Sequence, residues 1–198
     1  PMKALFVEEL TKHFPEISSI IVNINPRKTN VILGDECLIL HGQDRLESNI
    51  CGLKFVIHHN SFLQINHEQS SKLYTYVMEK LQLKKTDVVV DAYCGVGTMA
   101  LLAAKQAKYV HGIEIVPEAI QNAKDNQILN QINNAQFICG KSEVELDSIH
   151  DTIDAIILDP PRKGCDPALL DAIIKRNIAK IAYVSCNPAT LARDLQHL

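Results

Sequence analysis

Three carboxylates and one thiol lie at or just after short apolar runs in the second half of the chain. The runs are 88–90, 109–115, 153–158 and 181–184, and the side chains are Asp91, Glu114 near the end of the second run, Asp159 and Cys186. Carboxylates accept hydrogen bonds from hydroxyl groups, and a thiolate is a strong nucleophile. If the runs are parallel strands, these side chains meet at the sheet edge where α/β proteins bind ligands. The spacing therefore predicts a site that combines ligand binding with nucleophilic chemistry.

The turn after Asp91 resembles a nucleotide-binding loop. Gly95 and Gly97 allow the backbone to turn tightly and to approach a ligand, and Thr98 could cap the helix that follows. The free N–H groups of such a helix start would face a nucleotide or an amino-acid carboxylate. Because Gly95-x-Gly97-x-x-Ala100 also fits the dinucleotide fingerprint, the turn alone leaves both NAD and S-adenosylmethionine open.

Glu114 is a candidate for binding a ribose. It lies in Gly112-Ile113-Glu114-Ile115, an apolar strand in which a carboxylate needs a partner. At the end of that strand it could accept both hydroxyl groups of an adenosine ribose, and the adenine ring could lie near Gly140-Lys141-Ser142. Gln64 precedes this region, and its amide could either hold its own loop or contact a ligand.

Cys186 has the setting of a reactive cysteine. Asn187 and Pro188 should begin a helix over 189–195, which places the sulfur beside a helix N-terminus that favours a thiolate. Most cysteines are small buried hydrophobic residues. The position of Cys186 at the predicted ligand-binding edge favours the reactive interpretation.

The elements that must position these residues alternate between strand and helix from Asp87 onward, which predicts a parallel sheet covered by helices on both faces. A helix over 67–81, capped by Asn66, should precede this sheet. The first third reads as a small α+β appendage, part of a central domain, with a helix over 3–14 and strands over 17–24, 37–40 and 53–58. We place the boundary between 1–59 and the domain 60–198.

Composition describes an ordinary globular protein. The 198 residues are 46% hydrophobic and 22% charged with a formal charge of −3, which argues against an indiscriminate nucleic-acid binder but allows a local basic patch. Arg162, Lys163 and Arg193 are candidates for such a patch. Because no membrane span or signal peptide is visible, we expect a cytoplasmic protein. Six cysteines without a Cys-x-x-Cys pair suggest no metal site.

Four segments, in order, resemble the motifs of the RNA uracil-C5 methyltransferases, which act on bacterial 23S rRNA and on the T-loop of tRNA. They are Asp91-Ala-Tyr-Cys-Gly-Val-Gly-Thr, Gly112-Ile-Glu-Ile, Leu158-Asp-Pro-Pro-Arg-Lys-Gly and Tyr183-Val-Ser-Cys-Asn-Pro-Ala-Thr-Leu-Ala-Arg-Asp. Ser61-Phe-Leu-Gln-Ile-Asn matches the Phe-x-Gln-x-Asn segment that this family places ahead of its methyltransferase domain. The resemblance runs from about residue 60 to the end. It implies a Rossmann-like fold and S-adenosylmethionine as cofactor, with S-adenosylhomocysteine as product.

The resemblance also implies roles for single residues. Gln64, Tyr93, Glu114 and Asp159 would contact S-adenosylmethionine together with the glycine turn, and Cys186 would be the nucleophile that adds to C6 of a uridine. RNA is the implied partner, with 23S rRNA as the first choice and the tRNA T-loop as the alternative.

Relatives in this family continue with further strands and with the glutamate that removes the C5 proton, so we expect a chain truncated at its C-terminus and impaired in turnover. Relatives also usually begin with an RNA-binding barrel domain, and some have an iron-sulfur cysteine cluster; neither is visible in this sequence. A non-catalytic module that binds S-adenosylmethionine or RNA is therefore a competing hypothesis. An amine methyltransferase is disfavoured because such enzymes typically have an aromatic residue where Arg162 stands.

Overall fold

The central sheet of the computed structural model has five parallel strands in the order β7-β6-β5-β8-β9. The structure describes residues 2–28, 34, 36–59 and 61–198. The strands are β5 (Val88–Asp91), β6 (Tyr109–Glu114), β7 (Ala135–Cys139), β8 (Ala155–Leu158) and β9 (Lys180–Tyr183). β5 and β8 are buried along their whole length, as their aliphatic runs predict for inner strands. The chain reverses direction across the sheet between these two strands, which opens a crevice at their carboxyl ends.

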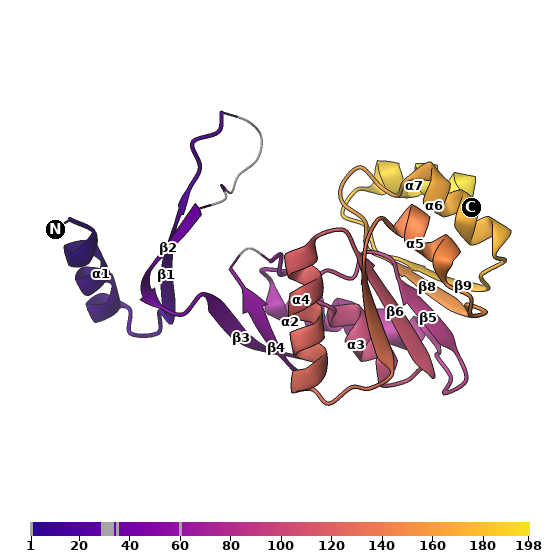
Figure 1. Ribbon diagram of the computed structural model, residues 1–198, viewed down its shortest axis with the longest axis horizontal. Helices are drawn as coiled ribbons and strands as arrows, with labels where there is room; N and C mark the ends of the chain where they lie inside the picture. The colour runs from indigo at the N-terminus through magenta and orange to yellow at the C-terminus, as the bar shows by residue number, and fades with distance from the viewer. Residues whose placement is uncertain (1, 29–33, 35, 60) are drawn as a thin grey trace.

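Two helical layers cover the sheet, one on each face (Figure 1). One layer contains α2 (His67–Leu81), α3 (Thr98–Ala104) and α4 (Pro117–Leu129), and the other contains α5 (Ser142–Ser148), α6 (Pro167–Lys175) and α7 (Pro188–His197). Each face of the sheet forms a hydrophobic core with its helices: the first core lies against α2, α3 and α4, and the second lies against α5 and α6. Because side chains alternate along a strand, Val89 packs in the first core, whereas Val90 packs in the second. The predicted parallel sheet with helices on both faces is confirmed.

A β-hairpin extends the first core beyond the helices. It consists of β3 (Arg45–Ile50) and β4 (Leu53–His58), joined by Cys51 and Gly52 with φ of 50° and 80°. Two consecutive positive φ angles are typical of a tight hairpin turn whose twist matches that of the strands. β3 was not predicted from the sequence. The division at residues 59 and 60 stays a prediction, although Phe55 and Ile57 of this hairpin are buried in the same core as α2 and α3.

Two asparagines of α4 and the asparagine at its C-cap bind the backbone of β4. Asn122, Asn126 and Asn130 are four residues apart and therefore share one helix face. Their side-chain oxygens accept hydrogen bonds from the amides of His58 at 3.2 Å, Val56 at 2.8 Å and Lys54 at 2.9 Å, respectively. The amide of Asn126 also donates to the carbonyl of Val96, in the glycine turn, at 3.2 Å. This asparagine ladder supplies hydrogen bonds to β4 on the edge that faces α4.

We expect Asn126→Ala to lower the free energy of unfolding by about 3 kcal/mol, because it leaves the Val56 N–H and the buried Val96 carbonyl without their partner. Asn130→Ala is the matched control: it also contacts β4 but lies nearer to solvent, and its loss should cost about 1 kcal/mol. Urea unfolding of the two variants measures both values. Equal losses would contradict a special role for Asn126.

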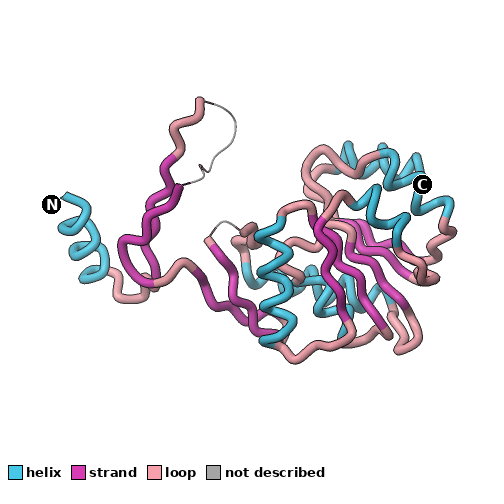
Figure 2. The backbone as a smooth tube through the Cα atoms, viewed as in Figure 1, coloured by secondary structure: helices cyan, strands magenta, loops and turns pink. Residues whose placement is uncertain are grey.

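The N-terminal segment projects away from the body (Figure 2). It contains α1 (Met2–His13) and an antiparallel pair of strands, β1 (Ser19–Ile24) and β2 (Glu36–Gly42). α1 has no buried residue. The predicted α+β character of the first third is confirmed, although its second strand is longer than expected.

Candidate active site

A cavity of about 820 Å³ lies at the carboxyl ends of the central strands. It brings together six of the seven residues predicted to form the site, which are Gln64, Tyr93, Gly95, Glu114, Asp159 and Cys186. Its wall also includes residues that sequence reasoning did not select: Ser61, Phe62, Val96, Val116, Glu118, Ala119, Pro160 and Pro161. Phe62 is 77% exposed, and its place as the aromatic residue of the Phe-x-Gln-x-Asn segment was the available signal for it.

The two glycines of the turn have different roles. Gly95 has a φ of 52°, and a Cβ built there would meet nothing within 4 Å, so its backbone is open to a ligand. Gly97 does not line the cavity. Its φ is 87°, and a Cβ there would come within 2.9 Å of the Phe137 ring. Gly97 is the N-cap of α3, so the prediction that Thr98 caps this helix is wrong.

Glu114 holds the strand end, the glycine turn and α4 together. One carboxylate oxygen, Oε2, accepts a hydrogen bond from the Gly95 amide at 3.2 Å, and Oε1 accepts one from the Val116 amide at 3.0 Å. Val116 is the N-cap of α4. Each carboxylate oxygen can accept a further bond, so Glu114 can bind ligand hydroxyl groups while it keeps these two contacts.

Two further carboxylates, the buried Asp91 and the half-buried Asp159, lie next to each other. A smaller cavity of about 70 Å³ is lined by Asp91 and Asp159, together with Gln64 and Tyr93. Asp91 is fully buried, and neither of its oxygens has a hydrogen-bond partner among the described residues. Burial, with a smaller contribution from the charge of Asp159, raises the pKa of Asp91 to about 7. Burial raises the pKa of Asp159 to about 6. A cation bound beside them would stabilise both as carboxylates.

The raised pKa of Asp91 makes stability depend on pH. Its pKa is about 7 in the folded protein against a usual value of 3.8. Between these values the folded state holds a proton that the unfolded state has released, so stability falls as the pH rises and levels off above about 7. Asp91→Asn should remove the part of this fall that Asp91 causes, while the part caused by Asp159 remains, and should be more stable than the unaltered protein at about pH 8, by on the order of 2–4 kcal/mol.

Urea unfolding at about pH 5 and about pH 8 tests this dependence. Asp125→Asn is the control, because Asp125 lies exposed on α4, where its side chain accepts a hydrogen bond from Gln121. If Asp91→Asn follows the same pH curve as the unaltered protein, Asp91 is not the titrating group.

Cys186 lies where the sequence predicted it, between β9 and the start of α7. Asn187 is the N-cap of that helix, and its side chain accepts a hydrogen bond from the Ala189 amide at 3.1 Å. Cys186 is exposed, and it lines the same cavity as Asp159 and Glu114. The sulfur is therefore accessible to a molecule that enters the cavity.

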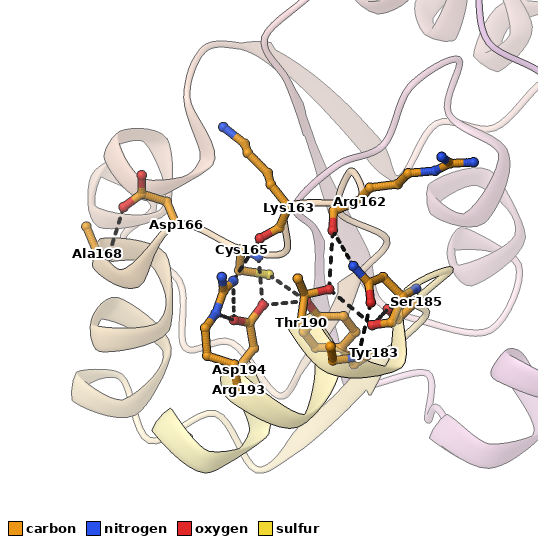
Figure 3. Close-up of polar contacts among 12 residues, drawn as sticks. Arg162, Lys163, Cys165, Asp166, Ala168, Tyr183, Ser185, Thr190, Arg193 and Asp194 are labelled. Atoms are coloured by element: carbon orange, nitrogen blue, oxygen red, sulfur yellow. Dashed lines mark hydrogen bonds and ion pairs between the residues drawn. The ribbon is translucent and has the colours of Figure 1, made fainter.

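The basic residues near this edge divide into two kinds. Arg162 and Lys163 are exposed, and their side chains extend away from the polar cluster around Asp194 (Figure 3). Arg193 instead forms an ion pair with Asp194 at 2.7 Å and donates to the Lys163 carbonyl at 2.8 Å. Arg193 is thus committed to contacts inside the protein, which argues against the phosphate contact considered for it.

A neighbouring cavity of about 430 Å³ shares Tyr93, Glu114 and Pro161 with the main one and reaches Gly140, Lys141 and Ser142. Ser142 begins α5, a helix that the sequence did not predict, and its hydroxyl donates to the Ala92 carbonyl. The segment considered for an adenine ring therefore lies directly beside the predicted ribose-binding residue.

Within the described residues, no group of three or more His, Cys, Asp or Glu side chains is placed to hold a metal ion. The helices of the described part of the chain are also too short or too polar to cross a membrane.

Comparison with known proteins identifies the family. The family model described as tRNA (Uracil-5-)-methyltransferase matches residues 17–198. A Bacillus cereus protein named an uncharacterized RNA methyltransferase is 46% identical over 100% of this chain and 44% of its own length. A protein of the same description from Listeria innocua is 44% identical over the same shares. The chain thus spans less than half the length of the curated relatives that it matches.

Solved structures of similar proteins agree with the family model. The Pyrococcus abyssi tRNA (uracil-54, C5)-methyltransferase in complex with S-adenosyl-L-homocysteine superposes with a TM-score of 0.77 at 30% identity, over 95% of this chain and 46% of that one. The M. jannaschii tRNA m1G37 methyltransferase, at 18% identity and a TM-score of 0.66 over 95% of this chain and 56% of its own, shares the fold alone. The fold is the Rossmann-like fold of S-adenosylmethionine-dependent methyltransferases, and the chain belongs to the tRNA (uracil-5-)-methyltransferase family.

Proposed function

We propose that this chain is the core of an RNA uracil-C5 methyltransferase that transfers a methyl group from S-adenosylmethionine to a uridine through a covalent adduct with Cys186. One observation carries the proposal. A single cavity contains an exposed cysteine at a helix N-terminus and the carboxylates of Glu114 and Asp159, at the ends of the two strands that flank β5. The family model and the uracil-54 methyltransferase structure support uracil as the base.

The residues present suit S-adenosylmethionine. The ligand carries a sulfonium and an ammonium cation, either of which would compensate the unpartnered carboxylate of Asp91 and the half-buried one of Asp159. Glu114 would accept the ribose hydroxyls, the open backbone of Gly95 would allow close approach, and Gln64 and Tyr93 would contact the ligand from the cavity wall. When bound, the cofactor supplies an electrophilic methyl group.

The protein itself would activate the uracil ring. C5 of uracil is too weak a nucleophile to take a methyl group directly. Addition of the Cys186 thiolate to C6 forms an S–C6 bond and moves the electron pair of the C5–C6 double bond onto C5, which becomes an enolate-type carbon. C5 then takes the methyl group, a base removes the C5 proton, and the returning electron pair expels the thiolate. We assign that base to none of the described residues.

The RNA substrate is the most specific part of the proposal. From the motif resemblance we favour 23S rRNA, with the tRNA T-loop as the alternative. The matching bacterial relatives at 44–46% identity carry the general name RNA methyltransferase, which is compatible with either RNA. The uracil-54 enzyme of Pyrococcus abyssi is more distant, at 30% identity. Mass mapping of 23S rRNA and tRNA from cells that lack the gene decides between them. A missing C5 methyl group in tRNA alone would contradict our choice, and none missing in either would contradict the activity.

A further inference from the structure

The loop that carries Cys186 is closed at its base by a buried carboxylate. Asp194 of α7 is 1% exposed, and its Oδ2 accepts hydrogen bonds from the Tyr183 hydroxyl at 2.6 Å and from the Cys165 amide at 2.8 Å (Figure 3). Tyr183 ends β9, three residues before Cys186, and Asp194 follows Cys186 by eight residues. One side-chain hydrogen bond therefore joins the two ends of the cysteine loop.

A second set of contacts fixes the same loop to the cofactor side of the cavity. The Arg162 carbonyl accepts hydrogen bonds from Asn187 Nδ2 at 3.2 Å and from Thr190 Oγ1 at 3.3 Å. Arg162 belongs to the stiff segment that begins with Asp159-Pro160-Pro161. The nucleophile loop and the segment that carries Asp159 are thus parts of one polar unit.

The local sequence is adapted to this carboxylate. Burial would raise the pKa of Asp194, but the hydrogen bonds from Tyr183 and Cys165 and the guanidinium of Arg193 together lower it, so that Asp194 is a carboxylate at neutral pH. Gly164 has a φ of 83°, and a Cβ there would lie 2.6 Å from Asp194 Oδ2 and 2.4 Å from Arg193 Nη2. Only a residue without a side chain leaves room for these bonds.

We propose that Asp194 is a positioning residue for Cys186. Through its hydrogen bonds with Tyr183 and Cys165, Asp194 holds the Cys186 sulfur at the cavity in the place required for addition to C6. The proposal rests on the function proposed above. Its physical basis is the steep dependence of reaction rate on the placement of reacting atoms, since a misplacement of about 1 Å can cost about 100-fold in rate.

The test uses the full-length protein with Asp194→Asn and Tyr183→Phe, which remove the charge and the hydroxyl with little change of shape. RNA that contains 5-fluorouridine reports the step directly, because fluorine replaces the proton that must leave C5, and the covalent adduct therefore accumulates. We expect adduct formation and kcat to fall by about 10- to 100-fold in both variants, with the KM for S-adenosylmethionine unchanged within about threefold.

Asp171→Asn is the matched control. Asp171 also anchors α7, through a 2.7 Å contact with His197 at the far end of the helix from Cys186. The Asp171→Asn substitution should leave the adduct rate unchanged even if it lowers the melting temperature. An adduct rate that is unchanged in Asp194→Asn, or that falls equally in Asp171→Asn, would overturn the positioning role.

Amide hydrogen exchange separates this proposal from the proposed function. Residues 184–191 should exchange faster in Asp194→Asn than in the unaltered protein, whereas β7 should not change. Unchanged exchange in 184–191 would overturn the closure of the loop by Asp194, whatever the activity. Absence of both adduct and methyl transfer in the unaltered protein would overturn the proposed function and, with it, the role of Cys186 as nucleophile. Faster exchange of residues 184–191 in Asp194→Asn would even then support the closure of the loop by Asp194.

Discussion

Replacing Cys186 by serine is expected to lower methyl transfer to RNA by at least about 1,000-fold, the scale on which loss of a covalent nucleophile acts. A serine hydroxyl is ionised far less than a thiol at neutral pH and does not add to C6 of uracil at a useful rate. Because Cys186 is exposed and directly precedes the N-cap of α7, its replacement should leave the fold intact, and binding of S-adenosylhomocysteine should stay within about threefold of the unaltered value. Transfer of a radiolabelled methyl group and calorimetry measure the two quantities.

A second exposed cysteine provides the control for Cys186. Cys139 ends β7 and lies outside the wall of the active-site cavity, so Cys139→Ser should keep full activity. The 5-fluorouridine adduct should form with Cys139→Ser and be absent with Cys186→Ser. Substantial transfer by Cys186→Ser would show that the reaction does not pass through this sulfur, and the proposed mechanism would then be wrong.

The residues of the site could be predicted because the chemistry of a parallel sheet collects at strand ends. Asp91, Glu114 and Asp159 each end or follow an aliphatic run, and runs of this kind form inner strands with little ambiguity. The register of such strands is shared, so their ends converge without any information about side-chain contacts. Gln64 is different: only the family motif indicated it, because an amide in a polar loop carries no signal of its own.

The parts that could not be predicted depend on contacts between segments distant in the chain. β3 has few apolar residues and becomes a strand because it pairs with β4, which the asparagine ladder of α4 supports from the other side. α5 is one short helix of seven residues whose start is fixed by Ser142. Asp194 appeared only as part of a motif. Its role becomes visible when Tyr183 and Cys165 are seen to meet its carboxylate.

Glu114→Ala is expected to weaken S-adenosylmethionine binding by about 100-fold. A charged hydrogen bond contributes about 1.5–3 kcal/mol, and tenfold in affinity corresponds to about 1.4 kcal/mol, so the loss of one or two ribose contacts accounts for this change. The substitution also removes the acceptor of the Gly95 and Val116 amides and loosens the glycine turn. Glu114→Gln keeps one acceptor oxygen and should lose about tenfold. Calorimetric titration with S-adenosylmethionine measures both variants.

Glu118→Ala separates this effect from a general loss of negative charge. Glu118 lies in the same cavity wall, in the first turn of α4, and its side chain forms no hydrogen bond or ion pair within the part of the chain that the structure describes. If the cofactor were attracted by charge alone, removing Glu118 or Glu114 would weaken binding to a similar extent, and added salt would reduce both effects. Binding through directed hydrogen bonds predicts instead that Glu118→Ala changes affinity by less than about threefold and that the loss in Glu114→Ala persists at high salt. Equal losses of affinity in the two variants would show that Glu114 does not bind the cofactor directly. Its role would then be structural, joining the glycine turn to α4.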